Sequence, residues 1–423
     1  MSKFLLAITA AVVALTFSGR AFSETQSGGP KDVSPLAQDQ VGGTELGVVE
    51  QQLKELAETR LQQYVTREHD RGGVLAFYRS RNFAPLWAAE NGVQRKAEQA
   101  AGFLANVASH GLDPADYPVP KFDDKNPLKL AADELTMTNS VLTFARHASI
   151  GRVAFTRVSG AIYFEQKVPA PAEILSKIAD SADVRATLDA FNPQHPAYKA
   201  LKAELAVARS RKFSEIDNTR GSVNAIVDTH ETNSKRKSKN TKRNPAEVKP
   251  TTASIDTIIA NLERWRWMPH DLGDAYVMVN IPDFTLKVVQ NGKTSWQTKI
   301  VAGKVGNQAT PLLTETMKYI TVNPTWNVPP SIINNEYLPA LARDPNALAR
   351  VGLKIGRNSD GSIRIFQPPS ERNALGRIRF NFPNRFLVYQ HDTPDKKLFN
   401  QTVRAYSHGC MRVENPNKYA ECC

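Results

Sequence analysis

The chain has 423 residues, of which 41% are hydrophobic and 23% are charged, and its formal net charge is +12 at pH 7. This composition is typical of a globular protein and excludes collagen-like and wholly disordered chains. The length allows two domains, and the positive charge favours contact with an anionic polymer or surface without naming one.

The first 23 residues have the pattern of an export signal. Lys3 precedes a mostly apolar run of 14 residues, Phe4 to Phe17, and small residues at Ala21 and Ser23 suit a signal peptidase. A membrane-spanning helix needs about 20 apolar residues, so the short run favours a cleaved signal over an anchor. We therefore expect export to the periplasm or cell envelope, with no membrane span in the mature chain.

The helical part of the chain is predicted from its apolar spacing. Residues 24–47 are rich in Ser, Gly, Gln, Pro and Asp, which predicts a flexible tether. Apolar residues then recur with helical spacing over 48–210, for example at Val141, Leu142 and Ala145. We expect a compact, mostly α-helical domain there.

A basic segment follows the helical domain, and residues 211–250 are predicted to be a second linker. Six cations fall within nine positions there, without an apolar stripe: Lys235, Arg236, Lys237, Lys239, Lys242 and Arg243. A solvated spacer is the favoured interpretation, and adhesion to an anionic polymer is the alternative. Nucleic acid is not an expected partner, because no aromatic residues interleave with the charges and an exported protein would rarely meet it.

Short β-prone runs dominate the remaining sequence, residues 251–423. Residues 276–281 and 284–289 flank Pro282-Asp283 as in a hairpin, and Asn291-Gly292 marks a turn before a strand at 296–301. Further strands are predicted at 318–322, 363–366, 378–382 and 386–390. These runs predict a mainly β, sandwich-like domain, so the fold class of the chain is α+β.

An excursion over about residues 324–373 interrupts the strands. It opens with a segment rich in Pro and Trp and continues with a helix-like stretch at 336–351. An insertion of this size is expected to be either a lid over a site or a decoration.

The chemistry of the chain centres on one thiol, Cys410. Since Cys422 and Cys423 are the only other cysteines, a disulfide framework is not expected, and a free thiol in an oxidising compartment is a liability unless it is used. His391 ends a predicted strand 19 residues upstream of Cys410, and His408 lies two residues before it. A thiolate needs such a base, or a positive field, to be populated near neutral pH.

Two neighbours of the thiol add to this pattern. Gly409 permits a tight turn that aims amides at a developing oxyanion, and Arg412 suits a substrate carboxylate. Plain packing of a buried Cys among histidines is an alternative, and so is a zinc site. No fourth ligand with a familiar spacing is visible, so metal is the less favoured interpretation.

The motif H-x15-S-H-G-C-M-R, from His391 to Arg412, resembles the active-site signature of the L,D-transpeptidase (YkuD) catalytic domain. Other stretches resemble the large branch of that family that contains a scaffold domain: residues 77–79, 85–87, 110–114, 116–117, 262–269, 279–282, 323–329, 391–394 and 413–416. The resemblance covers most of residues 61–423.

The resemblance implies a role for each motif residue. Cys410 is the nucleophile, and both histidines are catalytic candidates, with His391 lining the pocket if His408 is the base. Gly409 shapes the oxyanion pocket and Arg412 anchors the substrate.

Two more residues are carried over as substrate-binding candidates. For Ser407, the better interpretation is that its hydroxyl holds the turn by hydrogen bonding. Trp326 would line the donor groove, although a core tryptophan is the more usual outcome. The excursion at 324–373 corresponds to the substrate-capping subdomain of the family.

The implied reaction is peptidoglycan crosslinking, with stem peptides as partners. Cys410 attacks the diamino-acid carbonyl of a tetrapeptide stem, releases D-alanine, and passes the acyl group to the amine of a second stem. Hydrolysis by an L,D-carboxypeptidase, and attachment of a protein to the wall, are variants of the same acyl-enzyme. The family uses no metal or other cofactor, and carbapenems are expected to acylate Cys410.

Two features depart from the family pattern. Relatives carry a small peptidoglycan-binding domain where this chain has its basic linker. The chain also stops soon after a helix start at Asn415-Pro416, and Cys422-Cys423 is not expected to continue that helix. A truncated end, and a non-catalytic wall-binding protein, are therefore alternatives.

Overall fold

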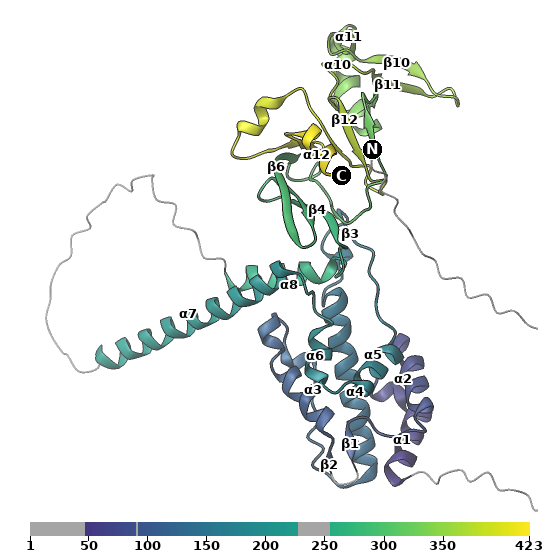
Figure 1. The fold of residues 1–423 in the computed structure, drawn as a ribbon, viewed down its shortest axis with the longest axis vertical. Coiled ribbons are helices and arrows are strands. Elements are labelled where there is room, and N and C mark those ends of the chain that lie inside the picture. The colour runs from purple at the N-terminus through teal and green to yellow at the C-terminus, as the bar shows by residue number, and fades with distance from the viewer. Residues whose placement is uncertain (1–46, 90–91, 227–253) are drawn as a thin grey trace, which may run out of the picture. The chain divides into compact units, whose positions relative to one another are not determined.

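The computed structural model describes residues 47–89, 92–226 and 254–423. A helical region, purple to teal in Figure 1, is followed by a mainly β region, green to yellow, so the predicted α+β class is confirmed. The predicted signal peptide, nearly all of the tether and the cationic part of the linker lie outside the described residues.

The helical region is built around α4. Its helices are α1 (Val48–Thr59), α2 (Glu68–Ser80), α3 (Arg95–Ala105), α4 (Pro127–Ile150), α5 (Pro171–Asp180), α6 (Val184–Asp189) and α7 (Pro196–Ile226). Short elements connect them: η1 (Leu61–Gln63), β1 (Ala88–Ala89), β2 (Gly92–Val93), η2 (Val107–His110), η3 (Pro114–Asp116), η4 (Phe155–Arg157) and β3 (Ile162–Tyr163). α4 starts at a cap, where Asn126 Oδ1 accepts from the Leu128 amide at 3.0 Å. Most of its side chains are buried, as expected for a central helix.

A buried carboxylate joins α4 to the segment that follows α2. Glu134 Oε1 accepts from Tyr78 Oη at 2.7 Å and from the Leu86 amide at 2.6 Å. Its Oε2 accepts from the amides of Trp87 and Ala88 at 2.9 and 2.8 Å. Burial raises the pKa of Glu134, and these four hydrogen bonds oppose the rise. The carboxylate thereby holds the Pro85-Leu86-Trp87 stretch against α4.

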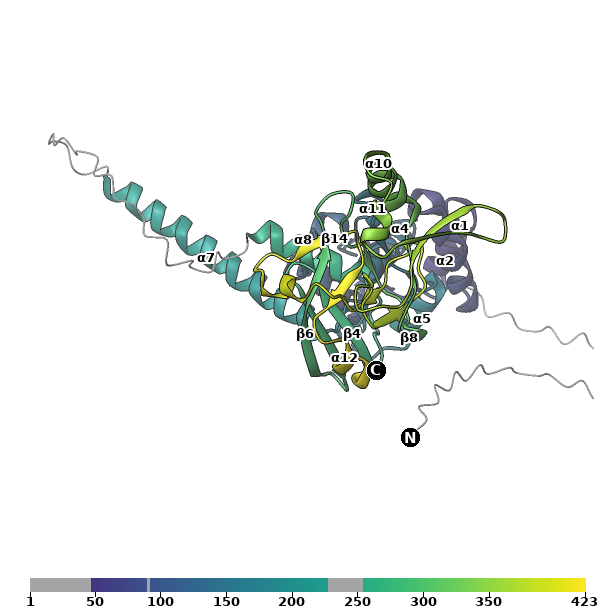
Figure 2. The ribbon, with the colours of Figure 1, turned by 90° about the horizontal axis from the view of Figure 1, so that it is seen from above.

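The helical region extends further along the chain than expected. α7 continues as one helix to Ile226, beyond position 210, in both views (Figures 1 and 2). α8 (Ile255–Trp267) packs against α7 and α4. The domain boundaries themselves stay predictions.

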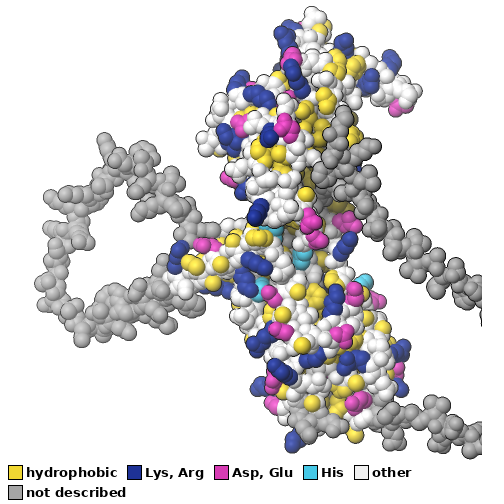
Figure 3. Space-filling model, viewed as in Figure 1, with side chains coloured by type: hydrophobic (Ala, Val, Ile, Leu, Met, Phe, Trp, Pro, Cys, Tyr) yellow, Lys and Arg dark blue, Asp and Glu magenta, His cyan; other side chains and the backbone are white. Residues whose placement is uncertain are grey.

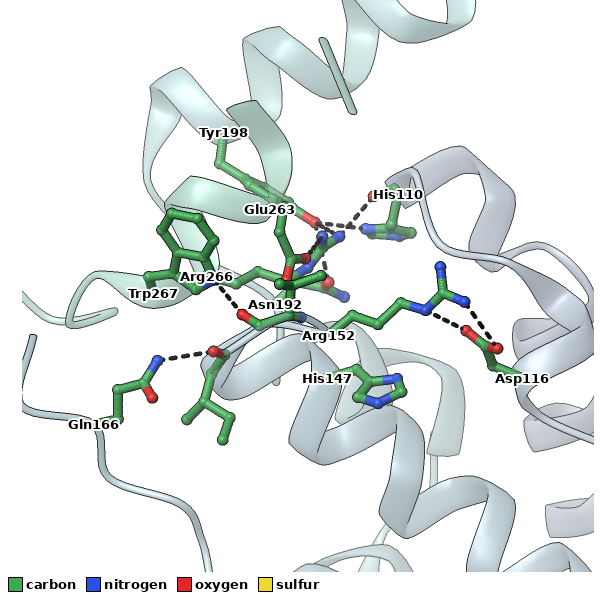
Figure 4. Close-up of polar contacts among 12 residues, drawn as sticks. His110, Asp116, His147, Arg152, Gln166, Asn192, Tyr198, Glu263, Arg266 and Trp267 are labelled. Atoms are coloured by element: carbon green, nitrogen blue, oxygen red, sulfur yellow. Dashed lines mark hydrogen bonds and ion pairs between the residues drawn. The ribbon is translucent and has the colours of Figure 1, made fainter. Parts of the chain in front are cut away.

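Arg266 anchors α8 (Figure 4). It is buried, and its guanidinium donates to the His110 carbonyl at 2.6 Å, to Tyr198 Oη at 3.0 Å and to Glu263 Oε2 at 3.2 Å. Trp267 Nε1 also donates to the Val153 carbonyl at 2.9 Å. The tryptophan-rich stretch at 262–269 therefore holds α8 on the helical region.

The β region forms one connected ladder. Its strands are β4 (Ala275–Asn280), β5 (Thr285–Gln290), β6 (Lys293–Gly303), β8 (Tyr319–Val322), β12 (Ile378–Asn381), β13 (Gln390–His391), β14 (Ala405–Ser407) and β15 (Met411–Val413). The order is β4-β5-β6-β15-β13-β12-β8, with β14 on β6. The predicted hairpin is confirmed as antiparallel β4 and β5, and Asn291 and Gly292 have positive φ in the next turn. A short strand, β7 (Leu312–Leu313), pairs in parallel with β3.

The two ends of this ladder share a hydrophobic core. Leu286 of β5 and Phe380 of β12 belong to the same buried cluster, although three strands separate β5 from β12. The ladder therefore curves over its own core, as in a sandwich. Tyr419 from α12 (Pro416–Cys422) completes the cluster, and its hydroxyl donates to Gln390 Oε1 at 2.6 Å. The expectation that Cys422 does not continue this helix is wrong, because the buried tyrosine anchors the helix on the core.

The predicted strand at 386–390 is also wrong, since only Gln390 and His391 pair as β13. Asn384 organises a turn there instead. Its side chain bonds to the backbone of Phe382, Phe386 and Val388, so the preceding residues are held away from the ladder.

The excursion within 324–373, called the cap below, is a folded unit. It contains α9 (Pro330–Ile332), a π-helical turn η5 (Ile333–Tyr337), α10 (Leu338–Arg343), α11 (Ala347–Arg350) and a sheet in the order β10 (Lys354–Arg357), β11 (Ile363–Gln367) and β9 (Trp326–Asn327). Val328, Ile332, Leu348, Leu353 and Ile365 form its core. The predicted helix at 336–351 is interrupted at Asp344-Pro345, because Pro345 disfavours a helical Asp344.

The surface of the described region is mixed in charge. Basic and acidic side chains are interspersed on the face in Figure 3. The described helices include none with the length and apolarity needed to cross a bilayer. The 3₁₀ turn η6 (Lys396–Asn400) lies between β13 and β14.

Candidate active site

The candidate site lies on one face of β13 and β15. These strands pair in parallel, with Gln390 opposite Met411 and His391 opposite Arg412. Successive side chains on a strand point to opposite faces. Met411 belongs to the core and Gln390 bonds to the core residue Tyr419, so these two occupy the core face. His391 and Arg412 therefore occupy the opposite face. Cys410 directly precedes β15 and packs against the core cluster, and its thiol is hydrogen-bonded to Tyr389, which directly precedes β13.

β12 adds a second arginine to this face. Arg379 lies opposite His391 in the antiparallel pair, while its neighbours Ile378 and Phe380 are in the core. Its guanidinium lies over the Tyr389 ring, 5.0 Å from the centroid. Since His391 is also opposite Arg412, the imidazole lies in register between two cations.

The environment of Cys410 has opposing effects on its thiol. Burial raises the pKa of Cys410 to about 11. Hydrogen bonds from the Tyr389 backbone and side chain, and the charges of Arg379 and Arg412, oppose the rise but do not overcome it. The thiol is therefore protonated at neutral pH in the unliganded protein, and a nucleophilic attack requires a group that accepts its proton.

His391 is an imidazole held neutral. Its Nδ1 is hydrogen-bonded to the Asp392 carbonyl, so Nδ1 carries the proton and Nε2 has the free lone pair. Burial and then the charge of Arg412 lower the pKa of His391 to about 3. The ring lies edge-on to Tyr389, with centroids 5.7 Å apart.

A tight turn presents the thiol. Ser407 Oγ accepts from the Gly409 amide at 3.2 Å and donates to the Cys410 carbonyl. Gly409 has φ of +112°, a conformation that favours glycine. Thr310 Oγ1 donates to the Gly409 carbonyl at 2.9 Å. Ser407 thus makes the hydrogen bonds of a turn-holding residue.

The cap meets this face through two side chains. Trp326 is partly buried against the cap core and hydrogen-bonds to Tyr389, which also bonds to the thiol. His408 is partly exposed, and its Nε2 is hydrogen-bonded to Glu336 Oε1 of η5. His391 therefore belongs to the sheet side of the site, and His408 contacts the cap.

Three residues of this arrangement were missed by the sequence analysis. For Tyr389 and Arg379, the only signal in the sequence is the alternation of polar and apolar residues, in Val388-Tyr389-Gln390-His391 and in Ile378-Arg379-Phe380. Glu336 has no local signal. Among the described residues, no group of three His, Cys, Asp or Glu side chains is placed to hold a metal ion.

Two family models and one curated protein match parts of this chain. Residues 274–423 match the model of the L,D-transpeptidase catalytic domain (YkuD), and residues 73–205 match that of the scaffold domain. A Haemophilus influenzae protein named "Putative L,D-transpeptidase" is 31% identical over 176 residues, which are 38% of this chain and 35% of that protein. The chain thus matches about a third of that relative's length.

Proposed function

We propose that this chain, a member of the L,D-transpeptidase family with a scaffold domain, crosslinks peptidoglycan stems through an acyl-enzyme on Cys410. One observation carries the proposal. A neutral imidazole lies in register between two guanidiniums, both guanidiniums act on the Cys410 thiol by their charge, and a glycine turn presents that thiol. This set provides a nucleophile, a proton acceptor and anion anchors within one site.

The first half of the reaction forms the acyl-enzyme. Cys410 Sγ bonds to the diamino-acid carbonyl carbon as its proton passes to Nε2 of His391. The carbon–nitrogen bond to D-alanine then breaks, and the amine leaves with the proton held by His391. Tyr389 is hydrogen-bonded to the sulfur, and this bond favours the thiolate that attacks.

The second half transfers the acyl group. The amine of a second stem attacks the thioester carbonyl, loses a proton to the neutral His391, and expels the sulfur, which regains that proton. Gly409 assists through its backbone conformation, since its amide is already donated to Ser407. Trp326 contributes to the donor side through Tyr389.

Arg412 and Arg379 are proposed to bind stem carboxylates. Neither forms an ion pair with a carboxylate of the residues that the structure describes, although Asp395 has an electrostatic effect on Arg412. Such cations are available to an anionic ligand, because no acid among the described residues neutralises them in contact.

Incubation with purified tetrapeptide muropeptides tests the function. We expect dimers joined between third-position residues, with release of D-alanine, and no product from Cys410→Ser. Trimmed monomers without dimers would instead indicate a carboxypeptidase. Absence of both products, and of a carbapenem adduct on Cys410 by intact mass, would indicate a non-catalytic wall-binding protein.

Export is the second part of the proposal, and it depends on the signal-like pattern of residues 1–23. We expect the mature protein in the cell envelope to begin at Glu24, and mass spectrometry of its N-terminal peptide would show this. The basic segment at 235–243 is proposed to add weak adhesion to anionic wall polymers, which high salt would abolish.

A further inference from the structure

Glu336 connects the cap to the nucleophile's own motif. Its Oε1 is hydrogen-bonded to Nε2 of His408, two residues before Cys410. Both side chains are partly exposed, so the bond between them is worth little as a source of stability. Stability therefore does not explain this bond, which joins the cap to the turn that presents the thiol.

The local structure of the cap explains why Glu336 points there. In a regular α-helix Glu336 would share a face with Ile332 and Ile333, four and three residues earlier, and these two pack into the cap core. The π-turn at Ile333–Tyr337 widens the helix and moves Glu336 out of that face.

The sequence supplies a cause for the π-turn. Pro339 has no amide hydrogen to donate to the carbonyl of Asn335, and its ring would clash with that carbonyl in a regular helix. π-Turns inside helices are frequent at functional sites.

We propose that Glu336 is a positioning residue that acts through His408, the second catalytic candidate of the motif beside His391, and that the cap thereby completes the transpeptidase site. The bond requires the His408 proton to be on Nε2 when the carboxylate is ionised, which leaves Nδ1 as the acceptor of the ring. A carboxylate that orients an imidazole in this way fixes both its tautomer and its direction. The inference rests on the proposed function and assigns to the cap a chemical contribution as well as a covering one.

The test uses a double-mutant cycle in the full chain. The rate constant for acylation of Cys410 by a carbapenem is measured for wild type, Glu336→Gln and Glu336→Ala. We expect Glu336→Ala to slow acylation about tenfold, less than the roughly 100-fold or more contributed by a general acid or base itself. Glu336→Gln retains an acceptor oxygen, so we expect a loss of about threefold, smaller than the tenfold loss of the alanine variant.

The decisive measurement repeats the Glu336 substitution in a variant that lacks the His408 imidazole. In a His408→Ala background we expect Glu336→Ala to change the rate by less than about twofold, because the effect passes through the imidazole. Glu371→Ala is the matched control, since Glu371 is an exposed cap carboxylate paired with Arg377, and it should leave the rate unchanged.

Nitrogen-15 spectra of the histidines provide a second readout. We expect the Nε2-protonated form of His408 in wild type and a mixture of tautomers in Glu336→Ala. An equal loss with and without His408, together with an unchanged tautomer, would overturn the proposal. If wild type itself forms no adduct, the proposed function fails, and the spectra still test the hold of Glu336 on His408.

Discussion

The buried carboxylate of Glu134 and the partly buried guanidiniums of Arg379 and Arg412 differ in the partners that the protein gives them. In the helical region, both oxygens of Glu134 accept hydrogen bonds, three of them from backbone amides. On the sheet, Arg379 and Arg412 flank a neutral imidazole, and neither forms an ion pair with a described carboxylate. A charge whose partners are all supplied by the protein stabilises a fold, whereas a charge without a counterion is available to a ligand.

The sharpest way to break this comparison is to remove the thiol. Cys410→Ala should abolish dimer formation and the carbapenem adduct, because no other side chain on this face is a nucleophile. Its free energy of unfolding should change by about 1 kcal/mol or less, since a partly buried thiol is replaced by a small apolar group. Muropeptide analysis and urea unfolding together measure both quantities. A stable variant with residual dimers would show that Cys410 is not the nucleophile.

Glu134→Ala should show the opposite pattern. It leaves the amides of Leu86, Trp87 and Ala88 and the hydroxyl of Tyr78 without their acceptor. We expect the free energy of unfolding of the helical region to fall by about 3 kcal/mol or more. Urea unfolding followed by tryptophan fluorescence measures it, with Glu55→Ala, an exposed carboxylate on α1, as the control. Carbapenem acylation per folded molecule should stay unchanged.

Part of this site can be predicted from the sequence, and the rest cannot. Cys410, Gly409 and Arg412 lie in one contiguous motif, and their placement follows from a turn and a strand. Arg379 was missed because it approaches the site only through the register of β12 on β13, which local sequence does not specify. The wrong strand at 386–390 has a related cause, since hydrogen bonds from Asn384 override the β propensity of the residues around it.

The cap shows a different limit of prediction. Helical residues in 336–351 were recognised, but Glu336 was not singled out, because its direction depends on the π-turn before Pro339. In the helical region, α7 continues past residue 210, and apolar residues keep a helical spacing there, at Phe213, Ile216, Val223 and Ile226. The polar composition of residues 211–250 hides this spacing, so composition alone predicts a linker too early.

Removing either arginine should change the ionisation of the Cys410 thiol, which tests whether these cations act on the nucleophile. Both cations lower the pKa of Cys410, which burial holds at about 11. Loss of one cation therefore raises that pKa further, and at any pH below it a smaller fraction of thiolate is present. We expect alkylation of Cys410 by iodoacetamide at pH 8 to slow about tenfold in Arg412→Ala and in Arg379→Ala.

The alkylation experiment needs a background in which Cys422 and Cys423 are serine, so that only one thiol reports. The pH–rate profile should shift to higher pH in each arginine variant. A profile that stays in place while binding of the stem weakens would show that the arginines anchor substrate without an effect on the thiol.

The smallest expected effect comes from Tyr389→Phe. The phenyl ring keeps its place under Arg379, and only the hydroxyl is lost, together with its hydrogen bonds to the thiol and to Trp326. Since the backbone amide of Tyr389 and both guanidiniums remain, the pKa of Cys410 should rise less than in the arginine variants. We expect acylation by a carbapenem to slow about threefold through the thiol alone. A loss of about 100-fold would instead show that the hydroxyl stabilises the oxyanion directly. Comparing acylation with alkylation separates an effect on the thiol from an effect on the oxyanion, because iodoacetamide forms no oxyanion. If only acylation shows the large loss, the hydroxyl belongs with the catalytic groups of the site.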